Sequence, residues 1–358
     1  VPAAQDCPYK AKHGTEVTLD LFGKLPGWAL VKWATLDCQF IGLEMEGGKP
    51  GWNDAMNGLP GMNASSVPDG MEVYRLNVFL IGKCAGLEKF ELLEEQAELL
   101  ERMLAAADKE DVYVRFIEAK EDFRAKVYAG LSGKTVEVRA EKLAALLYAV
   151  NKKIKEAIGR AQEENGGIIP TFVPFEVTRE GDGFSLKNLR FKKMCVASFL
   201  EANAKGLKIK GFCDPEKLYA AVRASDMFDK KLKVYKTSES LENESPMIGR
   251  VRTFSPGLYE RESCFLHMHY KYLLGLLESG LYDEYYRNMH EGFVCYMDPS
   301  VYGRSVLQNS SFIVSSAGRD KALVGRGFQP RLTGANAEVI SMVIGMFLGE
   351  KLFYMDGG

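Results

Sequence analysis

The sequence has almost no excess of charge of either sign. Its 358 residues include 46 Lys and Arg against 48 Asp and Glu, which leaves a formal net charge of −2. Proteins bind nucleic acids and anionic membrane surfaces with a clustered basic excess, because the phosphates need compensating cations. The composition therefore predicts that neither a nucleic acid nor a membrane is a partner.

Paired cysteines are also lacking. The seven cysteines are odd in number, scattered along the chain and never spaced as CxxC. This pattern argues against a disulfide framework and against a zinc ribbon. A reducing compartment is the simplest interpretation, and we expect a cytoplasmic location.

Long apolar runs and targeting signals are absent from the sequence as well. No stretch approaches the ~18 uninterrupted apolar residues that would cross a bilayer. The first residues, VPAAQDCPYKAKHG, contain no Met and no basic region followed by an apolar one. We expect no membrane span and no signal peptide, and we expect the chain to be a processed or incomplete piece of something longer.

Helical periodicity is the dominant pattern that the sequence does contain. Apolar residues recur at three- and four-residue spacing over most of the chain. The predicted helices cover 27–41, 86–109, 111–130, 140–163, 214–224, 260–278, 281–290 and 335–349. The charged faces of the helices between 86 and 163 are expected to be solvated. Asp214 is expected to cap its helix, with Pro215 at the first position. The stretch at about 166–212 is richer in β-branched and aromatic residues between Pro and Gly, which predicts a small β-containing excursion, and 228–248 is predicted to be a polar loop. Paired helices joined by long loops favour a mainly α fold of the α/α toroid type.

The stretch KPGWNDAMNGLPG at 49–61 surrounds polar residues with glycine and proline. Glycine and proline disfavour regular structure, so Trp52, Asn53, Asp54 and Asn57 are expected on a loop. An indole beside a carboxyl group suits carbohydrate chemistry. The ring stacks on a sugar, and its bulk desolvates the carboxyl group, which favours the protonated form that a general acid needs. A turn built on Asp or Asn beside a core Trp has the same spacing, so both interpretations stay open.

Two further stretches contain candidate binding residues. Glu260 and His267 are seven residues apart, which places both on one face of the predicted helix. His267 and His269 cannot share a face, so a metal-binding HxH pair is not expected. Thr333 and Gly334 precede the last predicted helix, where a hydroxyl and free backbone N–H groups can bind an anion. A Thr that only caps the helix would look the same.

Together these stretches resemble the catalytic barrel of the inverting oligosaccharide phosphorylases of glycoside hydrolase family 94 and its relatives. GWNDAMNGLPG is similar to the W-N-D segment of that family, in which the Asp is the general acid and the Trp contacts the sugar. The matching residues are Asp54 and Trp52. The segment 257–272 resembles the family's stretch of Glu followed by a phosphate-contacting His, which corresponds here to Glu260 and His267.

The sequence RLTGANAE at 331–338 resembles the phosphate-binding Thr-Gly turn of the same family, with Thr333 and Gly334 at the matching positions. The resemblance implies that His267, Thr333 and Gly334 bind phosphate. It also implies a set of substrate-binding residues, namely Trp52, Asn53, Asn57, Glu260 and Arg331.

The resemblance implies a reaction in which phosphate attacks the anomeric carbon of a β-linked glucan oligosaccharide. Asp54 would protonate the glycosidic oxygen, and α-D-glucose 1-phosphate would leave with inverted configuration. Inorganic phosphate is then a co-substrate, and no cofactor or metal is required. The resemblance further implies that residues 1–358 form the later part of an (α/α)6 barrel. The remainder of the same enzyme, as a second chain or a missing segment, would complete it, and a homo-oligomer is compatible with this organisation.

The residues leave two other functions open. An inverting glycoside hydrolase on the same toroid would need a second carboxylate, that of Glu260 or Glu262, to activate water. A non-catalytic carbohydrate-binding or assembly subunit would retain the barrel without the reaction.

Overall fold

The computed structural model describes residues 19, 21–49, 51–182, 185–329 and 333–349. Within them the fold is mainly helical, as predicted, with eleven α-helices and several short strands. The chain divides into two compact units, each assembled from segments far apart in the sequence. Unit 1 comprises Val1–Glu44, Asp69–Ala157 and Val177–Phe191, and unit 2 comprises Met45–Pro68, Ile158–Glu176 and Lys192–Gly358.

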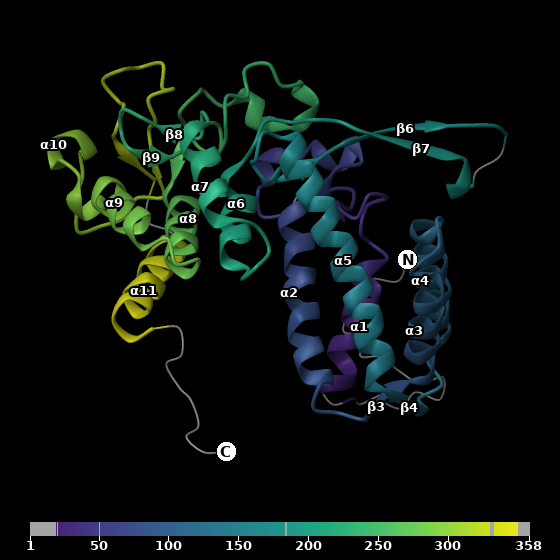
Figure 1. Ribbon diagram of the computed structural model, residues 1–358. Coiled ribbons are helices and arrows are strands. Elements are labelled where there is room, and N and C mark those ends of the chain that lie inside the picture. Colours follow the sequence, from purple (N-terminus) through teal and green to yellow (C-terminus); the bar gives the residue numbers. More distant parts are fainter. Residues whose placement is uncertain (1–18, 20, 50, 183–184, 330–332, 350–358) are drawn as a thin grey trace. The chain divides into compact units, whose positions relative to one another are not determined.

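Unit 1 is a bundle of helices (Figure 1). It contains α1 (Leu21–Trp33), β1 (Leu43–Glu44), most of α2 (Val67–Cys84), β3 (Lys89–Leu93), α3 (Glu94–Ala106), α4 (Val112–Ala129), β4 (Thr135–Arg139) and most of α5 (Ala140–Glu164). Strands β3 and β4 pair antiparallel at one end of the bundle. Asn77 accepts a hydrogen bond from the Trp33 indole at 3.1 Å and donates one to Asn151 at 2.8 Å. Because these buried polar groups are paired with one another, they fix how α1, α2 and α5 pack.

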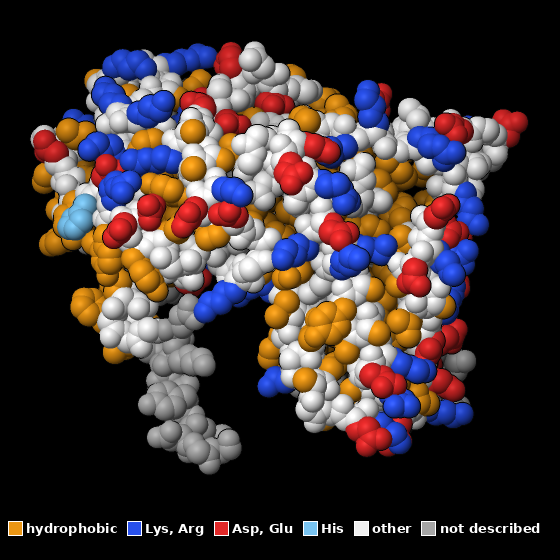
Figure 2. Space-filling view, in the orientation of Figure 1, with side chains coloured by type: hydrophobic (Ala, Val, Ile, Leu, Met, Phe, Trp, Pro, Cys, Tyr) orange, Lys and Arg blue, Asp and Glu red, His pale blue; other side chains and the backbone are white. Residues whose placement is uncertain are grey.

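Acidic and basic side chains are mixed over α3 and α4 (Figure 2). Arg102 of α3 contacts Asp122 of α4 at 2.5 Å, and Lys126 of α4 pairs with Glu98 of α3. All four side chains are exposed, and such pairs contribute little to stability. The prediction that the charged faces of these helices are solvated is confirmed.

Unit 2 is organised around α8 (Leu266–Glu278), which packs against α6 (Leu200–Lys208), α9 (Tyr282–Gly292) and α11 (Thr333–Leu348). Two glycines allow close packing on α8. A Cβ at Gly275 would lie 3.0 Å from the Ala204 carbonyl oxygen of α6, and one at Gly345 of α11 would lie 3.1 Å from a methyl group of Leu277. The packing of α8 therefore depends on small residues at its contacts.

Short helices and strands complete unit 2. They are β2 (Ser65–Ser66), β5 (Phe172–Val173), α7 (Pro215–Ala224), β8 (Phe228–Asp229), β9 (Val234–Tyr235), β10 (Cys264–Phe265), α10 (Pro299–Tyr302), β11 (Phe312–Ile313) and β12 (Gly327–Phe328). Strands β10, β11 and β12 form one antiparallel sheet, and β2 pairs with β5. The pair β6 (Phe175–Arg179) and β7 (Leu189–Lys193) runs through both units. As predicted, Asp214 caps α7, with Pro215 at its first position.

Several helix boundaries differ from the predictions in unit 1. The predicted helix 27–41 ends at Trp33, because the Asp37 carboxylate accepts three backbone N–H groups within the next five residues and closes a turn instead. The predicted helix 86–109 is a strand up to Leu93, since Lys89–Leu93 pairs with a segment about 45 residues further on. Helix α2 was not predicted. Its Pro68 lies in the first turn, where a missing N–H costs nothing.

Two predictions are corrected in unit 2. The predicted helix 260–278 begins only at Leu266, because Cys264–Phe265 pairs with β11 as a strand. The β-containing stretch at about 166–212 does contain β5, β6 and β7, but Leu200–Lys208 within it is helix α6. Leu200, Ala204 and Leu207 form the buried face of that helix.

Candidate functional site

The loop around Asp54 is held in place by close backbone contacts. It contains two 3-10 helices, η1 (Asp54–Met56) and η2 (Leu59–Met62), which pack against η4 (Pro246–Ile248) and η5 (Arg250–Thr253). A Cβ at Gly58 would lie 1.8 Å from the Met247 carbonyl oxygen, so only glycine permits this approach. Met56 and Leu59 are fully buried in a cluster with Ile248. The glycines of this loop therefore serve packing between two segments almost 200 residues apart.

Asp54 is exposed in this loop, with 70% of its side chain accessible. Its Oδ2 accepts a hydrogen bond from Nη2 of Arg250 at 2.6 Å. The expectation that Trp52 desolvates this carboxyl group is therefore wrong, because most of the Asp54 side chain is accessible to water. The Trp52 indole instead contacts Glu201 and Phe265.

A hydrogen bond holds one edge of the Trp52 indole, and a large part of the residue is exposed to solvent. Its Nε1 donates to Oε2 of Glu201 at 2.5 Å. The indole lies 5.8 Å from the ring of Phe265, centroid to centroid, and 44% of the residue is exposed. An indole held in this way presents an apolar surface of fixed orientation.

The two asparagines of the loop, Asn53 and Asn57, differ in their surroundings. Asn53 is 1% exposed, and neither atom of its side-chain amide has a hydrogen-bond partner among the described residues. Oδ1 of Asn57 accepts from the backbone N–H of Arg250 at 3.0 Å, which helps to fix that residue beside Asp54. Asn57 thus orients the loop contact, and Asn53 is buried beneath the surface.

Glu260 lies in a turn and not on a helix, so the helical spacing to His267 that the sequence predicts is wrong. Tyr259 and Glu262, on either side of it, have positive φ angles of 50° and 62°. Burial raises the pKa of the half-buried Glu260 carboxyl, and the charge of Asp54 adds to the rise, while its own backbone N–H and Arg250 oppose it. The turn therefore brings Glu260 close enough to Asp54 for their charges to interact. Helical periodicity does not predict this proximity.

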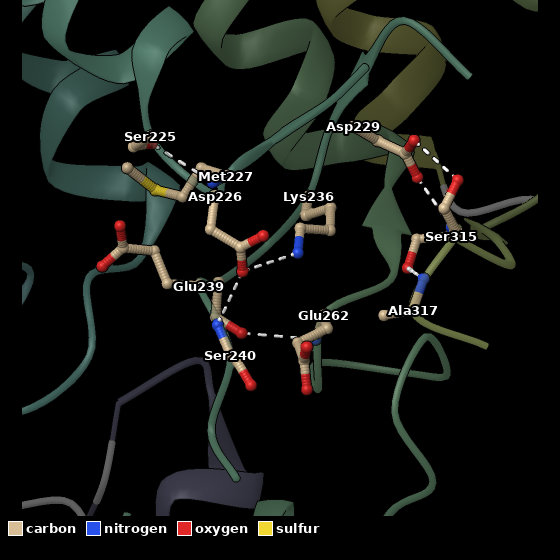
Figure 3. A network of polar contacts seen from close by, with 12 residues as sticks. Ser225, Asp226, Met227, Asp229, Lys236, Glu239, Ser240, Glu262, Ser315 and Ala317 are labelled. Carbon is tan, nitrogen blue, oxygen red and sulfur yellow. Dashed lines mark hydrogen bonds and ion pairs between the residues drawn. The ribbon is translucent and has the colours of Figure 1, made fainter. Parts of the chain in front are cut away.

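A polar network lies next to Glu262, two residues after Glu260 (Figure 3). The buried Lys236 bonds to Asp226 at 2.9 Å, and Asp226 also accepts from the backbone N–H of Ser240 at 3.0 Å. Ser238, which lies between Lys236 and Ser240 in the sequence, accepts a hydrogen bond from the backbone N–H of Glu262 at 3.2 Å. The predicted polar loop at 228–248 is thus a scaffold for the segment that contains Glu260.

His267 and Gly334, two of the predicted phosphate-binding residues, lie against each other. His267 is the second residue of α8 and Gly334 the second residue of α11. A Cβ at Gly334 would lie 2.6 Å from both Cε1 and Nδ1 of the imidazole, so only glycine lets the ring approach. Nε2 of His267 lies 3.4 Å from Oε1 of Glu338. Thr333 is exposed at the start of α11.

Amide side chains fix the first turn of α11 on α8. Tyr270 of α8 donates to Oδ1 of Asn309 at 3.0 Å, and Asn309 donates to Oδ1 of Asn336 of α11 at 2.8 Å. This chain of contacts explains how two helices distant in sequence present their N-termini together. Arg331, a predicted substrate-binding residue, lies outside the described residues.

Three lysines beside His267 were not predicted. Lys208 of α6 lies 3.6 Å from Oε2 of Glu338, and Lys205 lies 4.0 Å from Oε1 of Glu201. Lys271 of α8 is half-buried and follows His267 by four residues, on the same helical face. The four-residue spacing of His267 and Lys271 can be recognised in the sequence. Lys205 and Lys208 join this group only because α6 packs on α8.

The charges of this group act on one another. Burial acts to raise the pKa of Glu338, but the hydrogen bond with His267 and the charges of Lys208 and Lys271 outweigh it, so the pKa lies below its usual value. Burial lowers the pKa of the Lys271 ammonium, a change that Glu338 opposes and Lys208 reinforces. The group is therefore a compact set of interacting charges at the junction of three helices.

No three His, Cys, Asp or Glu side chains are grouped as a metal site within the described part of the chain. The six cysteines that the structure describes are free thiols. His269 faces away from His267, as predicted. It is fully buried, and its Nδ1 accepts from the backbone N–H of Tyr235 at 3.3 Å. None of the described helices combines the length and apolarity needed to cross a bilayer.

Acidification is expected to destabilise the protein through His269. Burial lowers the pKa of its imidazole to about 4, from an ordinary value of 6.5. Between these values the unfolded chain binds a proton that the folded chain does not, so stability is lost as the pH falls through this window. The full loss is about 3 kcal/mol.

Urea unfolding at several pH values between 7 and 4 measures this loss. His269→Gln is expected to flatten the pH dependence of the unfolding free energy. His290→Gln, which changes an exposed histidine, is expected to leave it as in the wild type. An unchanged slope in the His269 variant would contradict the assignment.

A scan against protein-family models and a search of curated proteins both return no match for this chain.

Proposed function

We propose that this protein catalyses the inverting phosphorolysis of β-linked glucan oligosaccharides and releases α-D-glucose 1-phosphate. The observation that carries the proposal is the convergence of His267 and the start of α11 with an exposed indole and a carboxylate. Phe265 links them, since its ring lies 5.8 Å from Trp52 and 5.9 Å from His267. Trp52 and Asp54 are two residues apart on one loop.

In the proposed reaction, phosphate binds beside His267 at the start of α11, where Thr333 and Gly334 supply a hydroxyl and backbone N–H groups. It attacks the anomeric carbon from the face opposite the leaving group. Asp54 donates a proton to the glycosidic oxygen, and the sugar stacks on Trp52. Phosphate is already an anionic nucleophile, so the reaction needs no second carboxylate and no metal.

The ion pair between Asp54 and Arg250 has to open before Asp54 can act as an acid. Both partners are more than half exposed, and exposed ion pairs are weak, so substrate can replace this contact at small cost. An oligosaccharide over Trp52 would then cover the carboxyl group and exclude water from it, which favours its protonated form.

A second candidate function, inverting hydrolysis, is favoured by one observation. Glu260 is half-buried within electrostatic range of Asp54, and burial raises the pKa of its carboxyl. Two carboxylates in different environments are what a hydrolase needs for an acid and a base. A non-catalytic carbohydrate-binding subunit is the third alternative, for which Trp52 alone would suffice.

The proposal extends to fold and partners. The chain would be the later part of an (α/α)6 catalytic barrel in the cytoplasm, with the β-containing excursion at about 166–212 as an insertion. The remainder of the same enzyme, as a second chain or a further segment, would complete the barrel. Its ligands would be a β-glucan oligosaccharide and phosphate.

Product analysis with and without phosphate tests the function. The protein is incubated with β-1,2-, β-1,3- and β-1,4-linked glucose oligosaccharides. The expected result is release of α-D-glucose 1-phosphate from one linkage class, only when phosphate is present. Release of free glucose independent of phosphate would instead establish the hydrolase. Binding without any product, with the remainder of the enzyme also present, would establish the non-catalytic subunit.

A further inference from the structure

The three helices that meet at His267 begin at the same place. Glu201, His267 and Gly334 are each the second residue of α6, α8 and α11 respectively. Near the other end of α8, Gly275 lies against α6 at Leu207, and Leu277 lies against α11 at Gly345. The three helices therefore run in the same direction, and the positive ends of their dipoles lie together.

Lys271 is close enough to both glutamates of this junction for their charges to interact with its own. Its ammonium interacts electrostatically with Glu201, which holds Trp52, and with Glu338, which holds His267. Lys271 is in the second turn of α8, and helical side chains lean toward the N-terminus. Its ammonium is therefore directed toward the first turns of the three helices.

Lys271 differs in its contacts from Lys205 and Lys208, the other two lysines of this junction. Lys208 and Lys205 each have a glutamate within 4.0 Å. Lys271 makes no hydrogen bond or ion pair within that distance to any described residue. A half-buried ammonium without a close partner is costly unless a ligand supplies one.

We propose that Lys271 binds the phosphate group directly, together with His267 and the first turn of α11. The ligand class is a phosphate anion, either free inorganic phosphate or the phosphate of an α-sugar 1-phosphate. Glu338 contacts His267, Lys208 pairs with Glu338, and Lys271 supplies the positive charge that the phosphate oxygens need. This inference rests on the proposed function and adds a binding residue that no sequence motif indicates.

Phosphate binding to the full chain, measured by titration calorimetry, tests the inference. Lys271→Met removes the ammonium while keeping the length of the side chain. It is expected to weaken binding of both inorganic phosphate and α-D-glucose 1-phosphate about tenfold or more, the effect of losing a charged hydrogen bond. Lys271→Arg is expected to retain most of the affinity. Lys217→Met, on exposed α7, removes the same charge and is expected to bind as the wild type does.

A second measurement uses the wild-type protein and does not depend on folding of a variant. Amine labelling at pH 8, followed by mass spectrometry, reports the reactivity of each lysine. Phosphate is expected to protect Lys271 and to leave Lys217 unprotected.

The outcomes separate the two proposals. Wild-type affinity in the Lys271→Met variant, or no protection of Lys271 by phosphate that does bind, would overturn the inference and leave the proposed function standing. Lys271 would then only balance the charges of Glu201 and Glu338. If the wild-type protein binds neither phosphate ligand, the proposed function itself fails, and this inference with it.

Discussion

Asp54→Asn is expected to lower the rate of phosphorolysis of an unactivated β-glucan oligosaccharide by about two to four orders of magnitude, the usual contribution of a general acid. The amide keeps the shape of the carboxyl group but cannot supply the proton that the leaving oxygen needs. Initial rates of α-D-glucose 1-phosphate release measure the loss. Binding of the oligosaccharide, measured separately, is expected to stay close to that of the wild type.

A matched control for this variant is Asp122→Asn. Asp122 of α4 is another exposed aspartate in an ion pair, here with Arg102 at 2.5 Å, and it belongs to unit 1. Its replacement is expected to preserve the rate. A substrate whose leaving group needs no proton, such as a nitrophenyl β-glucoside, should restore much of the rate of Asp54→Asn. Full activity of Asp54→Asn on the natural oligosaccharide would contradict the role of Asp54 and make Glu260 the next candidate acid.

Gly334→Ala is expected to raise the KM for phosphate by about tenfold or more, which corresponds to the loss of one charged hydrogen bond. The added methyl group would lie 2.6 Å from the imidazole of His267, so the ring has to move away. It would also obstruct the approach of an anion to the backbone N–H groups at the start of α11. The KM for the oligosaccharide is expected to change less, because Trp52 lies on a separate loop.

Gly345→Ala is the matched control, since it makes the same substitution on the same helix. There the methyl group meets only the flexible side chain of Leu277, at 3.1 Å. Both changes also favour helix formation, so a general effect of alanine on α11 would be common to the two variants. An unchanged phosphate KM in Gly334→Ala would show that phosphate does not bind at this junction.

The helical character of the chain was predictable because local periodicity determines it. The predicted helix 140–163 matches α5 within a residue, and the predicted cap at Asp214 is present. The errors arose where a distant partner overrides local preference. Lys89–Leu93 is a strand because Thr135–Arg139 pairs with it, and Glu260 leaves the helical pattern because β10 pairs with β11.

For the candidate site, the sequence by itself determined which residue types are available: an aspartate beside a tryptophan, a histidine at a helix start, and a Thr-Gly pair before the last helix. It also determined the glycines that close packing requires at Gly58 and Gly334. Tertiary structure alone decided that Asp54 pairs with Arg250 and that three lysines gather beside His267. These contacts join segments separated by tens to hundreds of residues, and their energies depend on burial and on the distances between charges, which only the packed helices fix.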